Sequence, residues 1–213
     1  MAPANSGRAD GFERVMRWVA LAWFVVWFPA YARVWGWTNF LHLCDVAVLL
    51  SVAGFVFRSP LLLSSQAIGT AALYLAWWVE ALTRCLTGRD LTGGLDYMWD
   101  ARYPLWVRLL SLFHVVLPIL LVWAVARRGY ERRALALESA IVTALLVVSR
   151  FYPSALNLNY AYRDPILHRA LGPAPVHLAA ILATIIVVGV LPVHVLLTRW
   201  CLAPRNRAGL SSA

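Results

Sequence analysis

Several polar or reactive side chains lie inside two long apolar stretches of the sequence. Side chains of these types can act as acids, bases or nucleophiles. In chain order they are Asn39, His42, Cys44, Asp45, Ser111 and His114. An imidazole can act as a general acid or base, and a thiol beside an imidazole can become a nucleophile. Buried cysteines are more often inert apolar residues, and buried histidines are often only hydrogen bonded. The residue types therefore leave both a chemical and a structural interpretation open.

The composition indicates what surrounds these residues. Of the 213 residues, 62% are hydrophobic and 14% are charged, and the mean hydropathy is +0.68. An ordinary soluble domain carries about 25% charged residues. The composition therefore excludes a soluble globule. It predicts an all-α fold, a polytopic membrane helix bundle of about six transmembrane helices that occupy roughly 120 positions.

The apolar runs and their breaks divide the chain into a membrane domain and two tails. Residues 1–17 are predicted to form an N-terminal tail, 18–202 the six-helix domain, and 203–213 a C-terminal tail. The predicted spans are 18–34, 38–57, 61–83, 104–126, 135–152 and 175–199. The short break at Arg58-Ser59-Pro60 makes the second and third spans an antiparallel hairpin.

The net charge is +9, and every basic residue is arginine, which is typical of a GC-rich bacterial genome. The arginines lie between apolar runs, where they attract anionic headgroups and set topology. Membrane lipids are therefore the expected partners, and no nucleic acid is implied. The dense basic loop at 127–133 favours a cytoplasmic side for that loop and both termini, in a bacterial inner membrane. Two long loops, 84–103 and 153–174, are then expected as folded caps on the opposite side. Nothing in the sequence indicates an oligomeric state.

The polar residues inside the predicted spans share one half of the membrane. On a continuous helix with about 100° per residue, Asn39, His42 and Asp45 fall within about 120° of one another. Ser111 and His114 lie at a matching depth in the fourth span. The pattern predicts a single polar cavity that opens toward the two long loops.

Pro118 adds a local feature at His114. Proline has no N–H, so a helical Pro118 leaves the carbonyl of His114, four residues earlier, without its intrahelical bond. We expect a kink there, a pocket beside the imidazole, and Ser111 one turn away as a hydrogen-bond partner. Pro192 frees the carbonyl of Val188 in the last span in the same way, so a proline alone is not diagnostic.

Short motifs between residues 39 and 197 carry a family resemblance. They are Leu41-His42-Leu43-Cys44-Asp45, Phe113-His114, Asn159-Tyr160-Ala161-Tyr162-Arg163-Asp164-Pro165 and Leu171-Gly172-Pro173. Together they resemble the YwaF-like family of bacterial integral membrane proteins, which includes the animal transmembrane protein 164. More distantly, the chain is similar to the androgen-induced-protein family of intramembrane fatty-acid ester hydrolases. In that second pattern a Thr nucleophile stands where this chain has His42.

The resemblance implies lipid acyl chemistry with Cys44 as the nucleophile and His114 as the base. The Cys44 thiolate would attack a phospholipid acyl ester, and His114 would take the thiol proton and then activate a lipid alcohol or water. Backbone donors or Asn159 would stabilise the oxyanion. The candidate orienting or substrate-lining residues are Asn39, His42, Asp45, Ser111, Asn159 and Tyr160. No cofactor or metal belongs to this scheme.

Two other classes of function stay open, as does a plain structural or assembly role. The first is a non-catalytic carrier or proton relay that uses His42, Asp45, Glu80 and His114. It needs polar groups in the other half of the membrane, where the sequence offers mainly Glu138, Ser139 and Thr143. The second is metal or haem ligation by His42 and His114, with Asp45 or Glu80 as a further ligand, although no H-x-x-x-H motif supports it.

Some ionisable residues have simple structural interpretations. Glu80 lies four residues before Arg84, which suits an intrahelical ion pair. His177 and His194 lie near the ends of the last span, where an imidazole at the membrane interface needs no special role. The 3 cysteines are widely spaced without a C-x-x-C pair, so neither a disulfide framework nor a zinc site is indicated.

Overall fold

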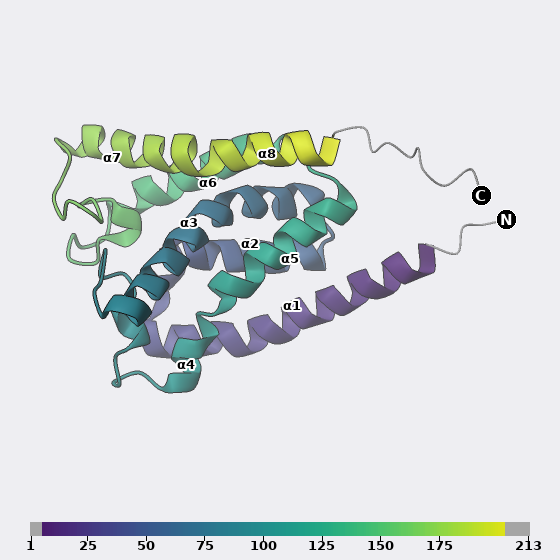
Figure 1. Cartoon of the computed structure of the whole chain (residues 1–213), viewed down its shortest axis with the longest axis horizontal. Coiled ribbons are helices and arrows are strands. Elements are labelled where there is room, and N and C mark those ends of the chain that lie inside the picture. Colours follow the sequence, from purple (N-terminus) through teal and green to yellow (C-terminus); the bar gives the residue numbers. More distant parts are fainter. Residues whose placement is uncertain (1–5, 203–213) are drawn as a thin grey trace.

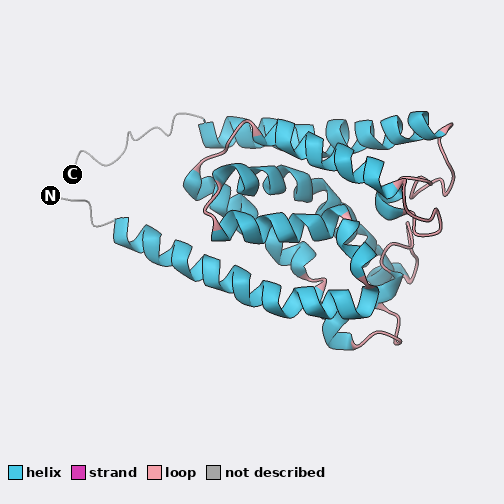
Figure 2. Cartoon of the chain, turned by 180° about the vertical axis from the view of Figure 1, so that it is seen from behind, coloured by secondary structure: helices cyan, strands magenta, loops and turns pink. Residues whose placement is uncertain are grey.

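The computed structural model describes residues 6–202, which form a bundle of helices (Figure 1). The main helices are α1 (Ser6–Trp35), α2 (Leu43–Val56), α3 (Pro60–Thr87), α4 (Leu105–Leu110), α5 (Phe113–Arg128), α6 (Ala134–Ser149), α7 (Ala174–Ala183) and α8 (Leu191–Leu202). Shorter segments are η1 (Trp37–Leu41), η2 (Asp96–Met98), η3 (Leu158–Tyr160) and the π-helical η4 (Thr184–Val190). No strand occurs in the described range (Figure 2), so the predicted all-α bundle is confirmed. The predicted C-terminal tail, 203–213, lies outside the described residues, as do 1–5.

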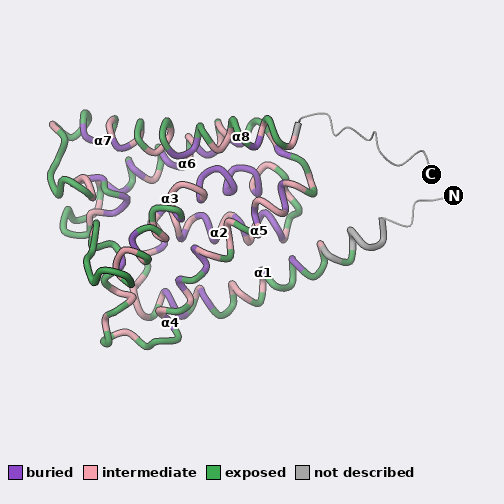
Figure 3. Tube along the Cα trace, in the orientation of Figure 1, coloured by how far each residue is buried: buried purple, intermediate pink, exposed green. Residues whose placement is uncertain are grey.

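Among the described residues, four helical stretches are long and apolar enough to cross a membrane. They are Glu13–Trp35, Pro60–Thr87, Leu105–Arg128 and Ala174–Cys201. The other two predicted spans correspond to the shorter apolar helices α2 and α6. Only 22% of the most apolar window in Ala174–Cys201 is buried, and Figure 3 colours most of α7 and α8 as exposed or intermediate. An apolar outward face is what a helix in contact with lipid requires.

Two predicted spans are interrupted where a continuous helix was expected. In the second span, His42 is extended (φ −67°, ψ 138°) between η1 and α2. The expectation that Asn39, His42 and Asp45 share one face of a helix is therefore wrong. In the fourth span, α4 and α5 are separated by a turn at Ser111.

The first and last spans also differ from the prediction. The first helix begins at Ser6, so part of the predicted N-terminal tail is helical. The last span is built from α7, η4 and α8, and its wide π segment directly precedes α8, in which Pro192 is the second residue. A proline removes one backbone donor from the helix, and π turns often occur where the regular bonding pattern is broken.

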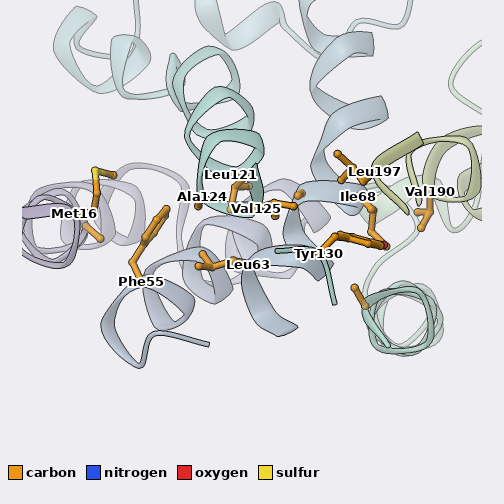
Figure 4. Close-up of a cluster of buried hydrophobic side chains, with 13 residues drawn as sticks. Met16, Phe55, Leu63, Ile68, Leu121, Ala124, Val125, Tyr130, Val190 and Leu197 are labelled. Atoms are coloured by element: carbon orange, nitrogen blue, oxygen red, sulfur yellow. The ribbon is translucent and has the colours of Figure 1, made fainter. Parts of the chain in front are cut away.

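The helix α3 is the centre of the bundle and packs against α2, α5, α6 and η4. Figure 4 shows a cluster of buried side chains in which Phe55, Leu63, Ile68 and Leu121 join α2, α3 and α5. Helices in lipid associate through close packing, because there is no water to release between them. Gly54 permits this close approach, since a Cβ at Gly54 would lie 2.9 Å from Leu63 Cδ2.

Ion pairs join three segments at one end of the bundle. Glu13 of α1 pairs with Arg128 at the end of α5, where Nε and Oε1 are 3.1 Å apart. Glu13 also pairs with Arg58 in the turn between α2 and α3 at 3.6 Å. The basic loop that follows α5 and the α2–α3 turn therefore lie at the same end, close to the first half of α1.

The two long loops meet at the opposite end. Glu80, near the end of α3, accepts hydrogen bonds from the amide and the hydroxyl of Thr92 in the first loop. A Cβ added to Gly94 of that loop would lie 3.6 Å from the hydroxyl of Tyr160 in the second loop. Both loops are folded against the bundle, as expected for caps.

Candidate functional site

His114 lies in the first turn of α5 and is packed among aromatic rings of α3. Its side chain is 6% exposed. The Trp77 ring stacks on the imidazole with a centroid distance of 4.9 Å and an interplanar angle of 4°. The Tyr74 ring meets it edge-on at 4.6 Å. These rings lie directly against the imidazole, where we expected a pocket opened by a kink.

The hydrogen bond at one ring nitrogen sets the tautomer of His114. Its Nδ1 lies 2.8 Å from the backbone carbonyl oxygen of Ser111. A carbonyl can only accept, so Nδ1 carries the proton and Nε2 of the neutral ring keeps a lone pair. In the described part of the chain, Nε2 has no hydrogen-bond partner. Ser111 is thus the partner that was expected, but it acts through its backbone, and its hydroxyl binds the Tyr31 hydroxyl at 2.6 Å.

The carbonyl of His114 has a partner from another helix. Pro118 is inside α5, and Trp78 Nε1 of α3 donates to the His114 oxygen at 2.8 Å. The proline therefore frees this acceptor as the sequence predicts, and the indole N–H replaces the missing backbone donor. The result is a cross-link between α3 and α5 at the level of the imidazole.

Tyr97 of the first long loop closes this site from the loop end. Its hydroxyl accepts a hydrogen bond from Trp77 Nε1 at 3.4 Å, and its ring lies 5.6 Å from the Trp35 ring. Burial raises the pKa of Tyr97 to about 12, although hydrogen bonds with Ser111 and Trp77 oppose that shift. The phenol is therefore neutral at physiological pH.

Cys44 lies in the first turn of α2 and is separated from His114 by Tyr74. The Tyr74 hydroxyl donates to the backbone carbonyl of Cys44 at 3.2 Å, while the Tyr74 ring contacts the imidazole. The thiol packs at the edge of an apolar cluster that includes Trp27 and Phe113. In the described chain no hydrogen bond joins the thiol to His114. The structure places both residues against Tyr74 but does not bring them into contact.

Asp45 and Asn39 form a buried pair beside Cys44. Asp45 is 2% exposed, and Asn39 Nδ2 donates to its Oδ2 at 2.5 Å. Their contact survives the break at His42 because η1 and the first turn of α2 fold against each other. The His42 side chain makes no capping hydrogen bond to α2, and within the described residues it is joined neither to Asp45 nor to His114.

Asn159, expected to orient substrate or stabilise an oxyanion, instead positions the backbone at the start of α2. Its Oδ1 accepts from the backbone N–H of Leu43 at 2.8 Å. Its Nδ2 donates to the carbonyl of Leu41 at 2.7 Å and to Ser149 Oγ at 3.0 Å. Both amide protons are thus in use, so Asn159 holds the start of α2 and has no free donor for an oxyanion. Its φ of 51° is a conformation that asparagine tolerates better than most residues.

Tyr160 and His177 connect the second loop to α7. His177 is 1% exposed, accepts from the amide of Leu171 at Nδ1 (3.2 Å), and has Nε2 2.9 Å from the carbonyl of Tyr160. Since Nδ1 accepts, Nε2 carries the proton and donates. His177 lies in the first turn of the last span, near its end as expected, and its imidazole is a buried structural connector. Tyr160 takes part through its backbone.

A second buried polar cluster lies in the other half of the bundle. Glu138 of α6 is 3% exposed and accepts hydrogen bonds from Ser65 and Gln66 of α3. The sequence signal for these partners is the run Ser64-Ser65-Gln66, which interrupts an apolar span. Thr143 is exposed, and its hydroxyl donates to the carbonyl of Ser139 within α6.

The expected ion pair between Glu80 and Arg84 is not formed. Arg84 instead pairs with Asp90 and Asp96 of the first loop, and its guanidinium lies 4.7 Å from the Trp99 ring. Within residues 6–202, no group of three or more His, Cys, Asp or Glu side chains is arranged to hold a metal ion.

Comparison with protein-family models, with curated proteins and with solved structures finds no match for this chain. The class of protein is therefore described from its fold alone. It is a helix bundle with four membrane-spanning candidates in its described part, and a buried imidazole lies near the end that carries the long loops.

Proposed function

We propose that this chain is an integral membrane protein that performs acyl-ester chemistry on membrane lipids, with His114 as the general base and Cys44 as the nucleophile. The observation that carries the proposal is the tautomer of His114, whose Nδ1 is bonded to the Ser111 carbonyl. This leaves Nε2 as a proton acceptor, which is what a general base requires.

The chemistry would proceed through a thioester. His114 Nε2 takes the Cys44 proton, and the sulfur attacks the acyl carbonyl of the lipid. The lipid alcohol leaves with the proton from the imidazolium, and the acyl group remains on sulfur. A second alcohol or water then attacks the thioester while Nε2 accepts its proton, and the thiol is restored. An alcohol as acceptor gives acyl transfer, and water gives hydrolysis.

Tyr74 would have to move for this reaction to occur. Its ring contacts His114 and its hydroxyl binds the carbonyl of Cys44. We infer that an acyl chain entering from the bilayer displaces the phenol and takes its place between the thiol and the imidazole. In our proposal the loop end faces the non-cytoplasmic side of a bacterial inner membrane, because Arg58 and Arg128 gather at the other end.

The test uses the purified full chain in lipid nanodiscs with a fluorescent phospholipid. Acyl release or transfer, and an acyl adduct that hydroxylamine removes, are expected for the native protein. Cys44→Ala and His114→Ala should abolish both signals. Cys201→Ala is the matched control, because Cys201 is also a partly buried cysteine. Turnover that persists in Cys44→Ala, in a folded variant, would refute the proposed nucleophile.

A proton relay is the second candidate, and one observation favours it. Buried polar side chains occur in both halves of the bundle, with Asp45 on one side and Glu138 on the other. Proteoliposomes with an internal pH dye would report proton flux, which should disappear in His114→Ala. Acyl turnover without flux would favour the enzyme, and flux without turnover would favour the relay.

A further inference from the structure

Glu138 is a carboxyl group built into the interior of the bundle. It lies about 6 Å along α6 from the first residue of that helix, at 1.5 Å per residue. Its Oε2 accepts from Ser65 Oγ at 2.6 Å and from Gln66 Nε2 at 3.1 Å. Gln66 Nε2 also bonds to Ser65 Oγ at 3.1 Å, so the two donors form one connected group on α3.

The second oxygen of Glu138 fits against a glycine. A Cβ added to Gly69 of α3 would overlap Oε1 and the carboxyl carbon of Glu138. The absent side chain at Gly69 therefore provides the space that the carboxyl occupies. Among the described residues, Oε1 receives no hydrogen bond, so the two oxygens of this carboxyl have different surroundings.

No cationic side chain neutralises Glu138 in the described part of the chain. Facing it from α3 are Ser65 and Gln66, and the nearest titratable group on that helix is Tyr74. The side of α6 that packs on α7 and η4 is apolar, with Val142 and Leu146 in a cluster with Ile181. An ionised carboxylate that has no cation beside it is costly in such surroundings even when it accepts hydrogen bonds, and buried acids take up a proton instead.

We propose that Glu138 is a proton-binding site, with the proton on Oε1 and two donors on Oε2. The proton exchanges with water at the end of the bundle that carries the basic loop. Ser64, next to Ser65, accepts a hydrogen bond from the backbone N–H of Glu131 in that loop at 3.1 Å. This site is separate from His114 and does not depend on acyl chemistry there.

The arrangement favours a proton over a metal cation. Ser65 and Gln66 both direct hydrogens at Oε2, whereas a cation site needs several oxygen lone pairs that converge on one point. In a protonated carboxyl, Oε2 still accepts from the two donors while Oε1 carries the hydrogen.

Dicyclohexylcarbodiimide tests the proposal in the full chain in detergent, because this apolar reagent adds to protonated carboxyl groups in membrane interiors. Cleavage at arginine yields the peptide 134–150, in which Glu138 is the sole carboxyl side chain. We expect this peptide to gain the N-acylurea mass, and Glu138→Gln to lose it. Asp164, a partly exposed residue of the second loop outside the membrane-spanning helices, is the internal control and should stay unlabelled. An unlabelled 134–150 peptide, or labelling that sodium suppresses at constant pH, would overturn the proposal.

Infrared spectroscopy gives a second measurement that does not depend on reagent access. At neutral pH, the native protein minus Glu138→Gln should show the carbonyl band of a protonated carboxylic acid. Gln retains the shape of Glu and can still accept from Ser65, which favours a folded variant. A difference spectrum that contains only carboxylate bands would contradict a bound proton.

Discussion

The side-chain amide of Asn159 accepts a hydrogen bond from the backbone N–H of Leu43 at 2.8 Å, across 116 positions of sequence. The same amide donates to the carbonyl of Leu41, so it satisfies the backbone on both sides of the break at His42. A loop side chain thereby fixes where α2 begins and, with it, the placement of Cys44 and Asp45.

Asn159→Ala should destabilise the protein, because it leaves the backbone groups of Leu41 and Leu43 buried without partners. A loss of about 1–3 kcal/mol for each unsatisfied group is typical. Thermal unfolding in detergent measures the change. Ser154→Ala, at an exposed position of the same loop, is the control and should unfold like the native protein. Equal stability of the two variants would show that Asn159 does not hold the start of α2.

Trp78→Phe should cost about 1 kcal/mol, since it removes the donor to the freed carbonyl of His114. Pro118→Ala restores a backbone N–H that can serve the same carbonyl. We therefore expect Pro118→Ala to recover part of the stability lost in Trp78→Phe. Unfolding measurements on both single variants and the double variant give the coupling. Strict additivity would mean that the indole does not substitute for the missing amide.

Gly69→Ala and Gly11→Ala should have opposite effects. A Cβ at Gly69 would overlap the Glu138 carboxyl, and overpacking of this kind costs about 1–3 kcal/mol. Gly11 lies in α1 with nothing within 4 Å of an added Cβ. There, Ala should stabilise the helix by about 0.5–1 kcal/mol. Similar unfolding temperatures for the two variants would remove the argument that Gly69 makes room for the carboxyl.

Tyr97 should ionise late in an alkaline titration. Burial raises its pKa to about 12, from an ordinary value of about 10. Because the folded pKa is the higher one, the stabilisation from this phenol is complete below about pH 10 and is lost as the pH rises toward about 12. Absorbance titration of the native protein against Tyr97→Phe isolates its phenolate signal. A phenolate signal that appears near the ordinary pKa of about 10 would contradict the burial of Tyr97.

The sequence predicts the structural features that depend only on residues close together in the chain. The apolar runs predict the helix bundle, and Pro118 predicts the freed carbonyl of His114, because both depend only on nearby residues. The break at His42 could not be predicted, since it is stabilised by Asn159 from a distant loop. The partner of the His114 carbonyl is likewise on another helix, at Trp78.

The candidate site was predicted in part, because residue type does not define orientation. His114 is buried with a defined tautomer, and Asp45 and Asn39 are paired. That Cys44 and His114 act together as nucleophile and base stays a prediction. Glu138 was placed in the correct half of the bundle, but its partners depend on how α3 faces α6, which a single sequence does not specify.

The π segment Thr184–Val190 sets the rotational phase of the last helix. One residue advances an α-helix by about 100°, so a wide turn rotates everything after it relative to a regular helix. With this rotation, Leu197 joins the buried cluster that contains Ile68. His194 Nδ1 then lies 2.6 Å from the Tyr130 hydroxyl. Deleting one residue within 184–190 would therefore turn both side chains toward lipid while leaving the composition of the helix almost unchanged.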